Sequence, residues 1–414
     1  MTDLREPLED LVAEVPAYVG ADAGAAWRAG RRRRHRRRLG TVAAVAALVV
    51  LAGGVVNQLP RASEPPVAGG DPAPGVTGHP GHVLKPWFER DLPDQPGPLA
   101  LLVHEGGSQW HGVSAEGRTW RVGADVPVDD FPPVLSEDGR MLGFLDDGSG
   151  YVIRDLVTGA EHRFDEIGDN RSIPRDETHW LAPQTPGFWS PDGSRLFLPA
   201  HAWDTDADGG GLVLDPDGSV QPVPRRVGWM AGWLDADTLA WVRASGEGRA
   251  RTAALVATRV TGEVVKRVPL DLRAREVDGL SQWSPTLSPD RARLAVALGH
   301  TTGALVTIST LDGSVIRREN VGIDGGCVTS WTDGEPAFSN YDGTLATTSG
   351  RVQVSVDPRM DIYCVMAAAD ALAGERHVGL AQRLFGDTWL AWRWREVAVG
   401  ALGGIAMLGA GAWL

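Results

Sequence analysis

A short pattern of apolar and polar residues recurs along the chain: β-forming residues, a turn rich in Asp and Gly, then β-forming residues again. The copies read LSEDGRMLGFL from Leu135, FWSPDGSRLFLPA from Phe188, GWLDADTLAWV from Gly232, TLSPDRARLAVAL from Thr286 and FSNYDGTLATT from Phe338. Asp-Gly or a close variant supplies a tight turn, and the alternating flanks predict a β-hairpin in each copy. The copies lie about 50 residues apart, a spacing typical of repeated four-stranded sheets.

The segments between the copies predict a second hairpin in each repeat, turning at Thr158-Gly159, at Thr261-Gly262 and at similar Asp-Gly pairs. A four-stranded sheet of this kind cannot bury its own faces, so such sheets stack radially into a closed ring. We therefore predict an all-β fold, a six-bladed β-propeller over residues 83–375, with seven blades as the alternative. The sixth blade is predicted over residues 328–367.

The best copy of the inner turn is Ser190-Pro191-Asp192-Gly193, while Ser288-Pro289-Asp290 lacks the glycine. This phrase resembles the SPDG repeat of the TolB-like and WD40-like β-propeller families, in a bacterial membrane-anchored form. The resemblance extends over the whole predicted propeller and implies a rigid disc with a central funnel, used most often for binding. It says little about function, because propellers serve as enzymes, scaffolds and receptors.

Two apolar stretches flank the repeats. Residues 39–56 follow a run of eight arginines within 28–38, and no charge occurs between Arg38 and Arg61. This length suits a transmembrane helix, and the arginines predict a cytoplasmic N-terminus with an uncleaved signal-anchor. Residues 397–414 also lack charge and predict a second transmembrane helix. The alternative there is a terminal strand or hairpin docked on the propeller.

The predicted order is a cytoplasmic basic tail (1–38), a transmembrane helix (39–56), a Pro/Gly-rich linker (57–82), the propeller (83–375), a juxtamembrane aromatic segment (376–396) and a second transmembrane helix (397–414). This order predicts a cell-membrane protein whose propeller is extracytoplasmic. The arginine run is expected to contact anionic membrane lipid.

The charge balance bears on possible partners. The formal net charge is −13 although residues 28–38 carry eight arginines, so the rest of the chain is more acidic still. Binding to nucleic acid requires a basic face that neutralises phosphates. We therefore expect no nucleic-acid partner.

One local motif has the spacing of a calcium loop. Asp204, Asp206 and Asp208 alternate before Gly209, and Asp215 follows eleven residues after the first. Alternate carboxylates can point at one cation while the glycine permits a sharp turn. The closing Glu of such loops is replaced by Asp215, so the alternative is an acidic, solvated hairpin loop. Ca²⁺ is the only cofactor that the sequence suggests.

Cys327 and Cys364 are the only cysteines, too few for a disulfide framework or a cysteine-based zinc site. One disulfide between them is expected in an exported domain, and two buried thiols are the alternative. Four tryptophans occur at or near the inner strands of successive blades, namely Trp189, Trp233, Trp283 and Trp331. Packing between blades is the expected role, with an aromatic ligand-binding face as the alternative.

No G-x-S-x-G motif and no H-x-x-x-H pair on a predicted helix occurs, so no catalytic residues are predicted and the protein is expected not to be an enzyme. The leading hypothesis is a membrane-anchored binding or scaffold module for a protein or cell-envelope ligand. The alternatives are a transmembrane sensor that signals to a cytoplasmic regulator, such as a sigma-factor system, and a propeller hydrolase with dispersed carboxylates.

Overall fold

The computed structural model describes residues 75–378 apart from gaps at 87–88, 107–108, 124–131, 147–149, 169–179, 182–186, 200–209, 225–226, 281–284, 299–303, 322–326 and 341. The predicted tail, both predicted membrane helices and most of the linker lie outside the described residues. None of the helices in the described part of the chain has the length and apolar character that a membrane crossing demands.

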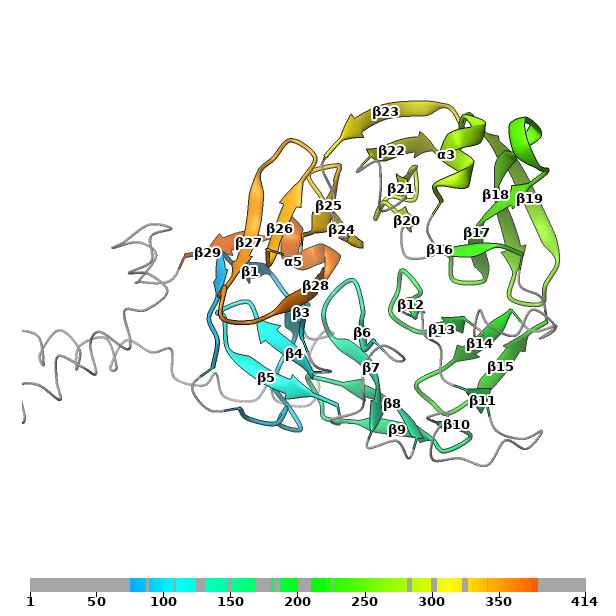
Figure 1. Cartoon of the computed structure of the whole chain (residues 1–414). Helices are drawn as coiled ribbons and strands as arrows, with labels where there is room; N and C mark the ends of the chain where they lie inside the picture. Colours follow the sequence, from blue (N-terminus) through cyan, green and yellow to red (C-terminus); the bar gives the residue numbers. More distant parts are fainter. Residues whose placement is uncertain are drawn as a thin grey trace, which may run out of the picture. The chain divides into compact units, whose positions relative to one another are not determined.

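Six sheets surround a common centre and form the blades of a β-propeller (Figure 1). Blade 2 is typical: β6 (Val134–Leu135), β7 (Met141–Asp146), β8 (Gly150–Asp155) and β9 (Glu161–Phe164) pair in sequence order, all antiparallel. The first strand of each blade lies nearest the centre and the fourth lies outermost. The predicted all-β, six-bladed architecture is confirmed.

Blades 3 to 5 repeat this order. Their strands are β12 (Phe188–Trp189), β13 (Leu196–Pro199), β14 (Gly211–Leu214) and β15 (Val220–Val223); β16 (Trp229–Asp235), β17 (Thr238–Ser245), β18 (Thr252–Arg259) and β19 (Val264–Leu270); and β20 (Thr286–Leu287), β21 (Arg293–Leu298), β22 (Ala304–Ser309) and β23 (Val315–Asn320). Smaller elements lie in the connections: the parallel pair β10 (Ile167–Gly168) and β11 (Trp180–Leu181), the 3₁₀ turn η2 (Gly248–Ala250) and helix α3 (Ala274–Asp278).

Blades 6 and 1 close the ring and differ from the prediction. Blade 6 contains β24 (Cys327–Thr332), β25 (Glu335–Ser339), β26 (Thr344–Thr347) and β27 (Val352–Val356). Strand β28 (Ile362–Ala367), predicted as part of blade 6, instead forms the innermost strand of blade 1, beside β3 (Leu99–Glu105), β4 (Gln109–Ser114) and β5 (Thr119–Val122). The two ends of the propeller sequence therefore share one sheet, a pairing that the local pattern of β28 does not encode.

The N-terminal segment forms a belt around the outer edges of neighbouring blades. Strand β2 (His82–Val83) adds in parallel to β27 of blade 6. Backbone hydrogen bonds then join residues 90–92 to Arg121 on the outer edge of blade 1, at 2.7 and 3.0 Å. Finally, Gln95 Nε2 donates to the carbonyl oxygen of Thr158 in blade 2 at 2.8 Å.

A second contact joins the two ends of the described chain. Strand β1 (Gly78–Pro80) pairs in parallel with β29 (Glu375–His377), which follows helix α5 (Ala369–Ala373). Strand β1 lies within the segment predicted as linker, residues 57–82, and β2 begins at the last residue of that segment. The high Pro and Gly content of this segment predicts a linker, and its two short strands pair only with segments that are distant in the sequence.

A buried serine fixes the inner turn in blades 2, 3 and 5. In blade 3 the Ser190 hydroxyl donates to Asp192 Oδ1 at 2.6 Å and accepts the backbone N–H of Arg195 at 2.9 Å. Gly193 has φ +66° and donates its N–H to the Ser190 carbonyl oxygen at 2.9 Å. Because an L side chain is strained at such a φ, the backbone of this turn favours Gly at this position.

Blades 2 and 5 build the same turn around Ser136 and Ser288, both fully buried. In blade 5 the residue in the glycine position is Arg291, which adopts φ +59°. A left-handed conformation costs a residue with a Cβ about 1–2 kcal/mol. The side-chain contacts of Arg291 described below offset this cost.

The hydrophobic core lies between the blades rather than in one centre. Two tryptophans join successive blades: Trp189 Nε1 donates to the carbonyl oxygen of Val134 at 3.2 Å, and Trp233 Nε1 donates to that of Phe188 at 2.7 Å. Both indole rings are buried. The predicted role in packing between blades thus holds at these two positions.

Candidate functional site

The two faces of the disc differ in the length of their connections. On one face, here called the turn face, two to six residues connect the first strand to the second and the third to the fourth in blades 2 to 6. The opposite face, the loop face, carries connections that are as short, such as 357–361 between β27 and β28, but also longer ones, such as the connection from β19 to β20, which holds helix α3. Long connections on a rigid scaffold are the usual carriers of binding function.

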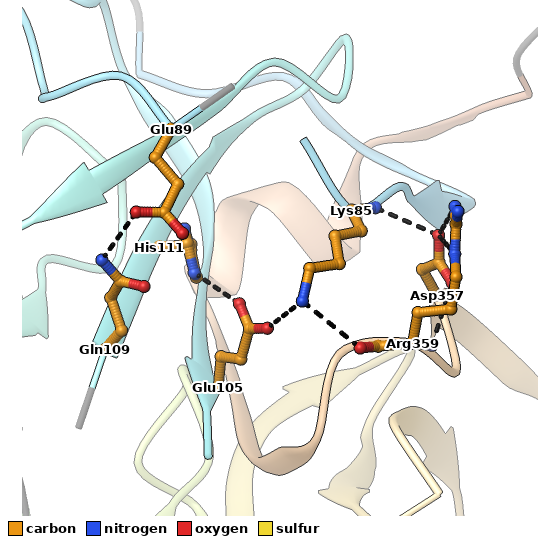
Figure 2. A network of polar contacts seen from close by, with 7 residues as sticks. All are labelled: Lys85, Glu89, Glu105, Gln109, His111, Asp357 and Arg359. Atoms are coloured by element: carbon orange, nitrogen blue, oxygen red, sulfur yellow. Dashed lines mark hydrogen bonds and ion pairs between the residues drawn. The ribbon is translucent and has the colours of Figure 1, made fainter. Parts of the chain in front are cut away.

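A network of polar side chains lies on the loop face where blades 6 and 1 meet (Figure 2). Lys85, just after β2, places Nζ 2.7 Å from Glu105 Oε1 at the end of β3. The other oxygen of Glu105, Oε2, lies 2.9 Å from His111 Nε2 on β4. One carboxylate therefore connects the N-terminal belt to two strands of blade 1.

The same network reaches the connection between β27 and β28. Asp357 is fully buried and accepts hydrogen bonds from the backbone N–H of Lys85 at 3.3 Å and from Arg359 Nη2 at 2.5 Å. Lys85 Nζ also donates to the Arg359 carbonyl oxygen at 3.4 Å. At the opposite end of the network Gln109 Nε2 donates to Glu89 Oε2 at 3.2 Å.

The environment sets the protonation of this network. Burial lowers the pKa of His111, and the neighbouring Glu105 charge opposes that shift only in part, so the ring is neutral near pH 7 and Nε2–H donates to the carboxylate. Burial opposes ionisation of Asp357, yet hydrogen bonds from Arg359 and from the Lys85 N–H outweigh it and hold the pKa below its usual value. Both groups are thus in the protonation states that the contacts require.

A His–carboxylate pair can serve as a general base, but His111 is only 1% exposed. Its ring does not reach a solvent-borne substrate, so the network is better suited to holding the ring closed. One signal for this network was present in the sequence and was not used: Lys85 is one of only two lysines in a chain with 40 Lys and Arg residues.

A second polar contact lies on the turn face. Glu137 belongs to the inner turn of blade 2 and Arg291 to that of blade 5, three blades away, and the two form an ion pair at 2.5 Å. Arg291 Nη1 also donates to the Ser288 carbonyl oxygen at 3.1 Å. The backbone N–H of Asp370 in α5 donates to the carbonyl oxygen of Glu137 at 3.0 Å. These contacts join opposite sides of the ring, and sequence reasoning did not identify them.

The predicted calcium loop lies mostly outside the described residues, which include only Asp215. Its Oδ1 pairs with Arg195 Nε at 3.1 Å, and its Oδ2 accepts the Ser219 hydroxyl at 2.8 Å. Within the described residues no group of three or more potential ligands could hold a metal ion. The site formed by Asp204, Asp206, Asp208 and Asp215 stays a prediction.

The two cysteines lie on the innermost strands of neighbouring blades, Cys327 at the start of β24 and Cys364 within β28. Cys364 falls within residues 328–367, predicted as blade 6, but β28 belongs to blade 1, so its predicted blade was wrong. Cys364 is disulfide-bonded. The side chain of Cys327 is not among the described ones, so the Cys327–Cys364 pairing stays a prediction.

The other two of the four tryptophans predicted to pack between blades are Trp331 and Trp283. Trp331 is 3% exposed and lies under the guanidinium of Arg293, 5.4 Å from its ring centre, with no hydrogen-bond partner for Nε1 among the described residues. Trp283 lies outside the described residues. The buried rings at positions 189, 233 and 331 are not available to stack on a ligand.

Comparison with known proteins finds similar folds but identifies no family for this chain. No protein-family profile matches the chain, and no curated protein matches it in sequence. Solved structures do resemble it, at low identity. Virginiamycin B lyase from Staphylococcus aureus has a TM-score of 0.38 and 10% identity, covering 64% of this chain and 85% of that one.

BamB from Moraxella catarrhalis has a TM-score of 0.34 and 12% identity, covering 65% of this chain and 89% of that one. TolB from Acinetobacter baumannii has a TM-score of 0.35 and 14% identity, covering 63% of each chain. At these identities the similarity concerns the fold alone. The chain is a six-bladed β-propeller whose blades are defined by its own strand pairing.

Proposed function

We propose that this chain is a membrane-anchored, extracytoplasmic β-propeller that binds a protein or cell-envelope ligand through its loop face. The observation that carries the proposal is the division of the disc into two unlike faces. In blades 2 to 6 the turn face carries short turns only, whereas the loop face also carries longer connections, such as the one that holds α3, and these can vary in sequence without disturbing the blades.

The positions of the chain ends support a defined orientation. The described chain begins at Gly75, and the Val76 N–H donates to the Asp138 carbonyl oxygen in the inner turn of blade 2. It ends after β29, which pairs with β1, so both ends lie on the turn face. If the apolar segments 39–56 and 397–414 anchor the chain, the turn face is the one nearer the bilayer and the loop face is directed away from it.

The polar network suits such a module. It ties the belt, blade 1 and the β27–β28 connection together on the face proposed for binding. A rigid platform lowers the conformational entropy lost when a partner binds. The proposal therefore assigns Lys85, Glu105 and His111 to holding the platform and not to contacting the ligand.

Site-specific photo-crosslinking in cells that express the full chain tests the proposal. A photoreactive residue at exposed Arg249 in η2 probes the loop face, and one at exposed Asp217, in the outer turn of blade 3, is the matched control on the turn face. We expect a discrete adduct with a protein or cell-envelope ligand from position 249, and no adduct other than with membrane lipid from position 217. A ligand adduct from position 217 alone would reject the assignment of the binding face.

A further inference from the structure

The exposed hydrophobic side chains of the described residues all occur at one level of the disc. There are six large ones: Val220, Val264, Val265, Leu311, Ile316 and Val352. Val220, Val264 and Val352 begin the fourth strands of blades 3, 4 and 6, Val265 and Ile316 are the second residues of β19 and β23, and Leu311 lies in the turn before β23. All six therefore lie at the turn-face end of an outer strand; we call this set the turn-face rim.

The rim is continuous between blades 4 and 5. Lys266 Nζ donates to the Thr310 carbonyl oxygen at 3.3 Å, which brings the start of β19 beside the turn that holds Leu311. Leu311 is 78% exposed, and Val264 and Ile316 are each 56% exposed. Aliphatic side chains exposed to this degree, and gathered at one level, mark an interaction surface.

Cationic residues accompany the apolar ones in three blades. Lys266 and Arg267 follow Val265, Arg317 and Arg318 follow Ile316, and Arg351 precedes Val352. Arg317, Arg318 and Arg351 have acidic partners within the protein. Lys266 donates only to a carbonyl oxygen, and exposed Arg267 forms no ion pair among the described residues. Exposed Glu263 and Asp312 lie beside Val264 and Leu311, so the rim carries charges of both signs; Lys266 and Arg267 are cations there that form no ion pair with a carboxylate among the described residues.

We infer that the turn-face rim rests on an anionic lipid surface, with Leu311 and the exposed valines entering the headgroup region and Lys266 and Arg267 near the lipid phosphates. This inference rests on the proposed membrane anchoring and adds a docked orientation to it. Both chain ends lie on the same face as the rim, so a tether at either end brings the rim toward the bilayer.

The chemistry of the rim favours lipid over an acidic protein. Protein interfaces concentrate their binding energy in clustered aromatic and Arg side chains within well-packed pockets. The large exposed hydrophobic side chains of the rim are instead all aliphatic; they extend over four blades, and Lys or Arg lies beside them in three of these. Dispersed aliphatic side chains with neighbouring Lys and Arg suit the boundary between headgroups and acyl chains.

Environment-sensitive fluorescence of the full chain, reconstituted into vesicles, tests the inference. Leu311→Cys carries an NBD label on the rim, and Glu247→Cys, beside η2 in blade 4, carries the matched label on the loop face. The unsubstituted chain, with Cys364 in a disulfide, is the labelling control. The vesicles contain phosphatidylcholine, with or without phosphatidylglycerol.

We expect the label at position 311, but not that at 247, to shift to the blue and to be quenched by a lipid-bound quencher in the anionic vesicles. Adding Lys266→Glu and Arg267→Glu should weaken this docking by at least about fivefold for each cation removed. These positions are exposed, so thermal unfolding of the variants should match the parent.

Several results would overturn the inference. Equal signals at 311 in neutral and anionic vesicles would remove the role of the anionic lipid, and a signal at 247 alone would reverse the orientation. A photo-crosslinker at 311 that captures a protein in cells and no lipid would assign the rim to a protein partner. Resistance of the chain to carbonate extraction reports the anchoring separately, so a failed rim and a failed anchor give different results.

Discussion

Glu137 and Arg291 pair across the turn face from opposite blades of the ring, at 2.5 Å. Arg291 takes the place of a turn glycine and tolerates φ +59° to do so. The backbone of Arg291 is therefore strained, and its side chain forms an ion pair that joins blade 5 to blade 2. A strained position with a long-range polar contact is a good place to test how the ring is held together.

Arg291→Gly should lower the free energy of unfolding by about 1–2 kcal/mol at neutral pH. The glycine relieves the backbone strain, but the Glu137 carboxylate is left without its cation in a largely buried position. Chemical denaturation measures the change. The double variant Glu137→Gln/Arg291→Gly should be more stable than Arg291→Gly, and equal or lower stability would contradict this account.

The acid titration of Glu137 should also be visible. Burial raises the pKa of this carboxyl, and the Arg291 charge opposes the shift only in part. The contribution of Glu137 is then fully present below the ordinary value of 4.5 and is lost as the pH rises through the raised pKa. Glu137→Gln should therefore flatten the pH dependence of stability just above pH 4.5. An unchanged slope would show that the group titrates normally.

Trp233→Phe should cost about 2–4 kcal/mol, because it removes both buried ring volume and the hydrogen bond to the Phe188 carbonyl oxygen. Trp331→Phe is the matched control, since Trp331 is also buried but its Nε1 has no partner among the described residues. The free energy of unfolding should fall less in Trp331→Phe than in Trp233→Phe. Denaturant unfolding of both variants would contradict the role of the hydrogen bond if the two losses were equal.

His79 should make the contact between the chain ends sensitive to acid. It is 2% exposed on β1, its Nδ1 lies 3.0 Å from the Ala371 carbonyl oxygen, and its Nε2 has no partner among the described residues. Burial lowers its pKa despite that hydrogen bond, and the Arg376 and His377 charges on β29 lower it further. Its contribution is present above pH 6.5 and is lost as the pH falls through the lowered pKa.

Hydrogen exchange of residues 78–83 and 375–377 between pH 7 and pH 5 measures this effect. Exchange there should rise at the lower pH more than in β17, after correction for intrinsic rates. His79→Gln keeps a donor for Ala371 and should remove most of the pH dependence. Burial also lowers the pKa of His111. If His79→Gln keeps the full pH dependence of exchange, the effect is assigned to His111 and not to His79.

Reduction should loosen the ring closure. Cys364 is disulfide-bonded and lies on β28, the strand from the C-terminal part that completes blade 1. A bridge to Cys327 would attach that strand to blade 6 and stabilise the fold by about 3–4 kcal/mol. We expect a reductant to lower the Tm of the parent and to leave that of Cys327→Ser/Cys364→Ser unchanged. Intact-mass analysis that found two free thiols would reject the bridge.

The repeats were predictable from sequence because each hairpin is specified locally. Alternating apolar residues set the strands, and the turn around Ser190 and Asp192 requires residues that lie next to each other in the chain. The partner of β28 was not predictable, because an apolar strand of this kind can complete any blade with a free inner edge. The pairing with β3 depends on where the ring closes, a property of the whole chain.

The polar contacts where blades 6 and 1 close the ring could not be predicted either, because they also join residues that are distant in the sequence. Lys85 and Glu105 are 20 residues apart, while Lys85 and Asp357 are 272 apart, and neither spacing forms a motif. Glu137 and Arg291 occupy turn positions where polar residues are expected for local reasons, which conceals their contact. Side chains that join distant repeats leave no periodic trace in a single sequence.

The parallel pairing of β1 with β29 also determines how the disc would respond to mechanical load. The incoming chain reaches the pair at Gly78 and the outgoing chain leaves it at His377, at opposite ends of the two strands. Tension applied through both flanks would pull the strands past each other along their length. Their hydrogen bonds would then share the force instead of breaking one after another, so the junction would resist stretching better than its few residues suggest.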